Sequence, residues 1–329
     1  MRSYLLIAVA LILPIAVSAQ SLGGLGDTGT SFTVSVNPQY PVPNGTASLS
    51  FLSSTLDLAN TTLSVSVGGT NIYQGSVRPV AVTLGKAGSI TNIVATIVAG
   101  GISYKQTLSI QPQDVVLIAE PISSAPMLYR GKPSVPLEGD VRVVAMANLR
   151  NAAGKAADPS TLSYSWTVDG AQIANSSGIG KTAIIVASPL QYRARDVSVA
   201  VMNPDGALVG GDSLSLSATD PLIRLYENDP LLGIRFDRAL PADYSIIGSE
   251  AALFAAPFSL PTTSGIPFIQ WFLNGETAQT GNSITLRPSG SGQGSASLSL
   301  TASSGTDTTA TANILLKFNI QKSSNFFGL

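Results

Sequence analysis

Two short motifs contain residue types that could perform catalysis. Residues 27–30 (Asp-Thr-Gly-Thr) match the tetrapeptide of aspartic proteases, but that chemistry needs two carboxylates that share a proton, and one copy is present. Residues 178–182 (Gly-Ile-Gly-Lys-Thr) resemble the end of a phosphate-binding loop. The full motif needs Gly where Asn175 stands, followed by a helix, whereas residues 183–186 have the pattern of a strand. We interpret both motifs as loops.

Three acidic residues could instead hold a cation. Asp220, Glu227 and Asp229 lie close together in the sequence, near an expected domain boundary. Calcium prefers carboxylate and amide oxygens, so the sequence predicts a calcium site that would stiffen the chain. The alternative is structural. Asp220 and Asp229 each precede a proline and favour turns, and nearby arginines could pair with them.

Composition excludes several other kinds of site. The chain has no histidine and no cysteine, so it cannot form an imidazole base, a thiol nucleophile or a cysteine-histidine zinc site. Charged residues are 11% of the sequence and the net charge is −1, which provides no basic surface for nucleic acid. We therefore expect no enzyme activity, no nucleic-acid partner and, apart from calcium, no cofactor.

The N-terminus predicts export. Residues 1–3 carry a positive charge, residues 4–17 are apolar, and small residues precede Gln20, as in a signal peptide cleaved after Ala19. The alternative is an uncleaved membrane anchor. The apolar run includes Pro14 and is shorter than the roughly 20 residues that a spanning helix needs. After cleavage we expect no membrane span and an extracytoplasmic protein, at the cell surface or secreted.

From residue 31 onward, apolar and polar residues alternate with the period of a β-strand, which predicts an all-β fold. In residues 162–168, Trp166 is one of the alternate apolar residues expected to face the core, and an Asp-Gly turn follows. Residues 269–275 repeat this pattern around Trp271, and residues 63–69 repeat it with Val65 in place of the Trp. A buried Trp on a central strand is typical of immunoglobulin-like sandwiches of about 100 residues. The predicted core residues are Tyr164, Trp166, Val168, Trp271 and Leu273.

We therefore predict three tandem immunoglobulin-like (PKD-like) β-sandwich domains after an N-terminal signal peptide. Short proline-containing segments separate the repeats. The expected divisions are a signal peptide (1–19), a Gly-rich leader (20–30), domain 1 (31–112), domain 2 (113–219), domain 3 (220–321) and a C-terminal tail (322–329).

Several stretches carry a resemblance to a known group of proteins. Residues 129–132, 141–145, 164–166, 177–181, 224–233 and 271–275 resemble uncharacterised exported proteins with tandem Ig-like or PKD-like domains from the candidate phyla radiation (Patescibacteria). Domain 1 departs from the pattern, because Val65 stands where a Trp is expected. The resemblance implies an envelope or cell-surface setting and brings no assigned activity or ligand.

Four phenylalanines are candidate partner-binding residues. Phe268 and Phe272 fall on the outward face of the Trp271 strand, and Phe326 and Phe327 stand in the tail. Burial by a loop or a neighbouring domain is the alternative for the first pair, and a frayed terminus is the alternative for the second.

The sequence thus favours an exported, non-enzymatic cell-envelope or surface protein, a structural or adhesive rod whose partners are other envelope or surface proteins. An alternative is an accessory subunit of a secretion or pilus-type envelope machine. A carbohydrate-binding surface module ranks third. It would need exposed Trp or Tyr platforms, and both tryptophans are predicted core residues.

Overall fold

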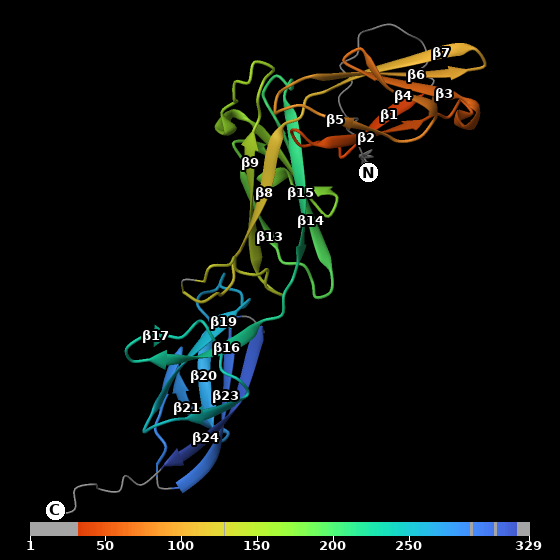
Figure 1. The fold of residues 1–329 in the computed structure, drawn as a ribbon. Coiled ribbons are helices and arrows are strands. Elements are labelled where there is room, and N and C mark those ends of the chain that lie inside the picture. The colour runs from red at the N-terminus through yellow and green to blue at the C-terminus, as the bar shows by residue number, and fades with distance from the viewer. Residues whose placement is uncertain (1–31, 128, 290–291, 306–307, 321–329) are drawn as a thin grey trace, which may run out of the picture. The chain divides into compact units, whose positions relative to one another are not determined.

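The computed structural model describes residues 32–127, 129–289, 292–305 and 308–320, and these form an all-β chain (Figure 1). Its helical elements are three short 3-10 turns: η1 (Leu58–Asn60), η2 (Pro159–Thr161) and η3 (Ala174–Ser176). The predicted signal peptide, the Gly-rich leader and the tail lie outside the described residues. No helix within the described part is both long and apolar enough to cross a bilayer.

The first sandwich packs a three-stranded sheet against a four-stranded sheet. The smaller sheet has the order β1 (Thr33–Asn37), β2 (Thr46–Leu52), β5 (Val80–Thr83). The larger has the order β4 (Thr70–Ser76), β3 (Thr62–Val67), β6 (Thr91–Ala99), β7 (Ile102–Ile110). Alternate residues of both sheets enter one core, which includes Leu49 and Phe51 from β2 and Leu63 and Val65 from β3.

The second sandwich repeats this plan. One sheet has the order β13 (Ala183–Ala187), β9 (Asp140–Asn148), β8 (Asp114–Pro121). The other has the order β11 (Ala171–Gln172), β10 (Ser163–Val168), β14 (Ala194–Met202), β15 (Val209–Ser217), with β12 (Gly178–Ile179) also paired to β10. Trp166 of β10 lies opposite Val199 of β14 in the register and is buried, as are Val141 and Val143 of β9.

The third sandwich packs a four-stranded sheet against a five-stranded sheet. The smaller sheet has the order β17 (Gly233–Ile234), β16 (Leu222–Asp229), β19 (Ala251–Phe258), β22 (Ser283–Leu286). The larger has the order β18 (Asp243–Ile246), β24 (Thr309–Ile320), β23 (Gly292–Ser303), β20 (Phe268–Leu273), β21 (Glu276–Thr280). Strand β18 pairs with β24 in the parallel sense, whereas the other paired strands with a given register are antiparallel.

The chain divides into two compact units, and the first contains residues up to 114 together with residues 148–157. Within this unit the Gln113 side chain donates to the Arg150 carbonyl at 2.9 Å and accepts from the Arg150 N–H at 2.6 Å. Gly88 lies against the same segment at a φ of 81°, where a Cβ would come within 2.6 Å of the Arg150 carbonyl oxygen. Only glycine allows that approach.

The second unit contains residues 115–147 and 158–329. Within it, segment 122–124 pairs with segment 259–262. The Ser124 N–H donates to the Leu260 carbonyl at 2.7 Å, and the Ser124 hydroxyl accepts from the Leu260 N–H at 3.1 Å. The Thr308 hydroxyl adds a bond to the Glu138 carboxylate at 3.1 Å. Backbone pairing therefore joins the segment that follows β8 to the segment that follows β19.

Candidate binding site on the second sandwich

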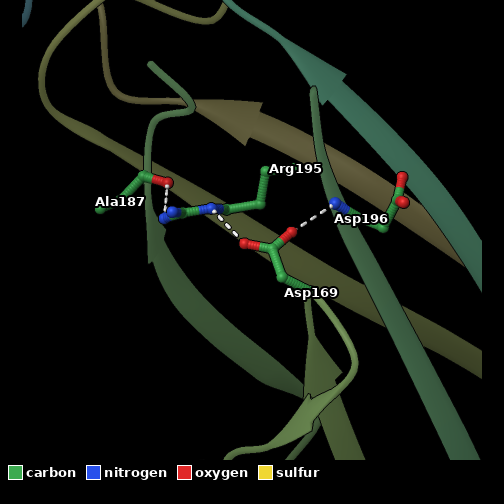
Figure 2. Close-up of polar contacts among 4 residues, drawn as sticks. All are labelled: Asp169, Ala187, Arg195 and Asp196. Carbon is green, nitrogen blue, oxygen red and sulfur yellow. Dashed lines mark hydrogen bonds and ion pairs between the residues drawn. The ribbon is translucent and has the colours of Figure 1, made fainter. Parts of the chain in front are cut away.

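The turn after β10 organises a polar cluster (Figure 2). Asp169 has a φ of 50°, and its N–H donates to the Asp196 carbonyl at 2.9 Å. Its carboxylate accepts from the Asp196 N–H at 3.0 Å and from Nε of Arg195 at 3.1 Å. Arg195 also donates from Nη1 to the carbonyl of Ala187 at 2.8 Å. One guanidinium thus connects the end of β13 with the turn after β10.

This cluster closes the base of the loop formed by residues 188–193. Ala187 is the last residue of β13 and Arg195 is the second residue of β14, so the guanidinium holds the two ends of the loop together. The Arg195–Asp169 ion pair is partly exposed, and such pairs stabilise a fold by less than about 1 kcal/mol. The ion pair matters here because it fixes the positions of the two ends of the 188–193 loop.

The loop contains an unusual turn. The Arg193 N–H donates to the Leu190 carbonyl at 3.0 Å, which closes a four-residue turn with Tyr192 at its third position. Tyr192 has a φ of 61°, a conformation that glycine adopts readily in such a turn and that costs another residue about 1–2 kcal/mol. Its side chain is 94% exposed. A large aromatic ring therefore stands in solvent on a backbone that would suit glycine better.

A pocket of about 320 Å³ lies beside this turn. Its lining includes Gln191, Tyr192, Arg193, Ser217 and Asp220, together with two alanines. The Gln191 side-chain amide donates to the Asp220 carboxylate at 3.2 Å. The lining thus offers an aromatic ring, an amide, a guanidinium and a single carboxylate. This set can bind a ligand, but one carboxylate does not make the pair that acid-base hydrolysis requires.

The predicted core residues lie inside the sandwiches to different extents. Tyr164, Trp166 and Trp271 are fully buried, whereas Val168 and Leu273 are half-buried at the ends of their strands, next to the turns. Both indole N–H groups donate to a backbone carbonyl. The Trp166 N–H donates to the Lys181 carbonyl at 2.8 Å, and the Trp271 N–H donates to the Gly281 carbonyl at 2.7 Å. Each buried indole therefore has its hydrogen-bond partner.

The three carboxylates predicted to bind calcium have separate surroundings. Asp220 lines the pocket, while Asp229 accepts the N–H groups of Leu231 and Leu232 at 2.8 and 2.9 Å in the turn before β17. The bonds from Leu232 and then Leu231 lower the pKa of Asp229, because they favour its charged form. In the described part of the chain, no three acidic side chains are grouped to hold a metal. The structure therefore does not bring Asp220, Glu227 and Asp229 together as a calcium site.

The structure describes two of the four predicted partner-binding phenylalanines. Phe268 is 56% exposed at the start of β20 and Phe272 is half-buried on the same strand. Ile266, two residues before the strand begins, is 91% exposed. Phe326 and Phe327 lie outside the described residues.

Sequence reasoning did not find the pocket beside Tyr192. The available signal was a Pro-Leu-Gln-Tyr-Arg stretch between two apolar strands, in which a bulky aromatic stands where turn chemistry would place Gly or Asn. Asp220 was singled out, but as a metal ligand. Its actual neighbour, Gln191, is 29 residues away in the sequence.

No known protein family and no curated protein matches the chain. Among solved structures, it is similar to three N-terminal domains of the bacteriophage RB49 Highly Immunogenic Outer Capsid protein, with 13% identity over 88% of this chain and 100% of that one, at a TM-score of 0.25. Fibronectin(III)-like modules of Clostridium thermocellum CbhA are 10% identical over 63% of this chain and 98% of that one, at a TM-score of 0.24. The central fibronectin-III array of RIM-binding protein is 12% identical over 88% of this chain and 98% of that one, at a TM-score of 0.27. Likeness at this level carries no functional argument, so the immunoglobulin-like fold is assigned from the sheets themselves.

Proposed function

We propose that this chain is an exported, non-enzymatic protein of the cell envelope or cell surface, and that its tandem sandwiches present contact surfaces to other envelope or surface proteins. The observation that carries the proposal is the exposure of Ile266 and Phe268, which together with the half-buried Phe272 we call the β20 patch. The N-terminal sequence supports the export part of the proposal.

Comparison of two equivalent strands supports a binding role for the outward phenylalanines of β20. When Trp166 is aligned with Trp271, the outward positions of β10 are Ser163, Ser165 and Thr167, and those of β20 are Phe268, Gln270 and Phe272. Both strands bury their tryptophan completely. Because β10 achieves this with hydroxyl residues outside, the aromatic residues on β20 are explained better by contact with a partner than by stability.

The absence of histidine and cysteine supports a binding role. Without histidine or cysteine, a nucleophile would need a lysine or carboxylate base. The pocket beside Tyr192 is lined by one carboxylate and no lysine. An accessory subunit of a secretion or pilus-type machine would use the same patch, and the identity of the captured partner separates this alternative from a structural or adhesive role.

Site-specific photo-crosslinking in intact cells tests the proposal. A photoreactive phenylalanine analogue at position 268 should crosslink to envelope or surface proteins, whereas the same analogue at exposed Thr285 on β22 serves as the matched control. The mature chain should begin at Gln20 when its N-terminus is measured by mass spectrometry. Crosslinking at position 268 no stronger than at position 285, or a chain retained in the cytoplasm with residues 1–19 attached, would contradict the proposal.

A further inference from the structure

The pocket beside Tyr192 is separate from the β20 patch and has a different chemical character. Its lining combines polar side chains with an aromatic ring and two alanines, and it lies at the surface of the second sandwich. We propose that this pocket binds a neutral saccharide, with Tyr192 as the stacking surface and Gln191, Arg193 and Asp220 as the hydrogen-bonding side chains. The ligand class follows from the ring, the polar groups and the charge balance.

The ring of Tyr192 provides the first argument. It is 94% exposed and stands at a φ of 61°, so neither burial nor turn geometry explains the choice of tyrosine. Backbone conformations of this kind persist where the residue serves a function. The C–H face of a sugar ring is apolar, and covering an aromatic face with it removes both surfaces from water.

The polar side chains provide the second argument. An amide, a guanidinium and a carboxylate are planar groups, and each can make two parallel hydrogen bonds. Neighbouring hydroxyls on a sugar ring can both donate and accept, so they match such groups. The bond from Gln191 to Asp220 at 3.2 Å already orients two of the three side chains.

Charge and size define the ligand further. Arg193 and Asp220 are the charged residues of the lining, and their charges cancel, so the pocket has no excess positive charge to select a phosphate or sulfate group. The volume of about 320 Å³ is at the lower end of the roughly 300–1,000 Å³ range of small-molecule sites. It suits one or two sugar rings at the end of a larger glycan.

The Arg195–Asp169 cluster prepares the loop for binding. The guanidinium bonds to Ala187 and Asp169 hold the base of the 188–193 loop (Figure 2), so less loop motion is lost when a ligand binds. Asp169 and Arg195 do not line the pocket and act as positioning residues.

Binding of the mature full-length chain (residues 20–329) to an array of neutral, sialylated and sulfated oligosaccharides tests the proposal. We expect binding to neutral oligosaccharides, followed by titration calorimetry with the strongest of them. Tyr192→Gly should weaken that binding at least about tenfold while keeping or raising the melting temperature, because glycine suits the turn. Tyr192→Phe should bind within about threefold of the unmodified chain, since it keeps the ring.

Leu190→Ala is the matched control, because Leu190 is exposed in the same turn but does not line the pocket. It should leave the affinity unchanged. Failure of every neutral oligosaccharide to bind, binding restricted to sialylated or sulfated ones, or full affinity in Tyr192→Gly would each overturn the proposal. None of these outcomes bears on crosslinking at position 268, so the two proposals fail independently.

Discussion

The turn after β10 and the turn after β20 have the same backbone design but differ in charge. Asp169 and Asn274 have φ values of 50° and 52°, and a glycine follows each. Both N–H groups donate to the carbonyl of a residue in the long strand that pairs with β10 or β20, at 2.9 Å to Asp196 of β14 and 2.8 Å to Ser297 of β23. Both side chains accept the N–H of that same residue, at 3.0 and 2.9 Å.

The choice of Asp at position 169 and Asn at position 274 reflects two requirements, the geometry of the turn and the charge of the side chain. Positive φ together with a side-chain acceptor requires Asn or Asp, and either residue satisfies the turn. Only Asp adds a negative charge, and in the second sandwich that charge holds Arg195 and the base of the Tyr192 loop. The backbone therefore sets the residue class, and the neighbouring loop explains the charged member of that class.

The largest expected effect concerns the fully buried tryptophan that the second and third sandwiches share. Trp166→Ala and Trp271→Ala should each lower the free energy of unfolding of their own sandwich by about 3–5 kcal/mol, because each removes a fully buried indole. Urea unfolding followed by amide hydrogen exchange measures the loss in the altered sandwich. The chain has two tryptophans, so the fluorescence of the remaining one serves as the control for the other sandwich. A change below about 1 kcal/mol in either variant would show that the two cores are not equivalent.

Exchanging the two turn residues tests the difference directly. Asp169→Asn should keep the turn and lose the ion pair, so the free energy of unfolding should fall by less than about 1 kcal/mol while amide hydrogen exchange in residues 188–193 becomes faster. Asn274→Asp is the matched control and should leave exchange in that loop unchanged. Equal exchange in the two variants would show that Arg195 does not restrain the loop.

The smallest expected effect is the pH dependence of the turn at Asp229, whose carboxylate accepts the N–H groups of Leu231 and Leu232. The N–H groups of Leu232 and Leu231 lower its pKa in the folded state below 3.8. A lowered folded pKa means that Asp229 contributes stability above the unfolded pKa and loses it as pH falls through the folded value. Carboxyl titration by NMR should give a midpoint below 3.8, and Asp229→Asn should abolish that part of the acid dependence. A midpoint above 3.8 would contradict the turn geometry.

Much of the fold could be predicted because strand periodicity and turn chemistry are local. The all-β prediction is confirmed, and the turns at residues 169–170 and 274–275 have the positive φ values that their Asp-Gly and Asn-Gly pairs indicate. Pairing between distant segments was not predicted. Neither the parallel β18–β24 ladder nor the approach of Gln113 to Arg150 leaves a periodic signal in the sequence.

The candidate site was harder to predict than the fold. The acidic residues suggested calcium because they are close in sequence, but Asp229 is used by its own turn and Asp220 faces Gln191. Tyr192 was missed because a tyrosine at positive φ contradicts ordinary turn preferences. Such exceptions to local rules are expected where function, not stability, determines the residue.

The parallel ladder between β18 and β24 has a mechanical consequence. Strand β24 is bonded on one side to β23 and on the other to β18, whereas β7 pairs with β6 alone in the described register. Tension applied along β24 from its C-terminal end would load the β18 bonds in shear, so they would have to break together and not one at a time. The third sandwich is therefore built to resist pulling at its C-terminal strand better than the first.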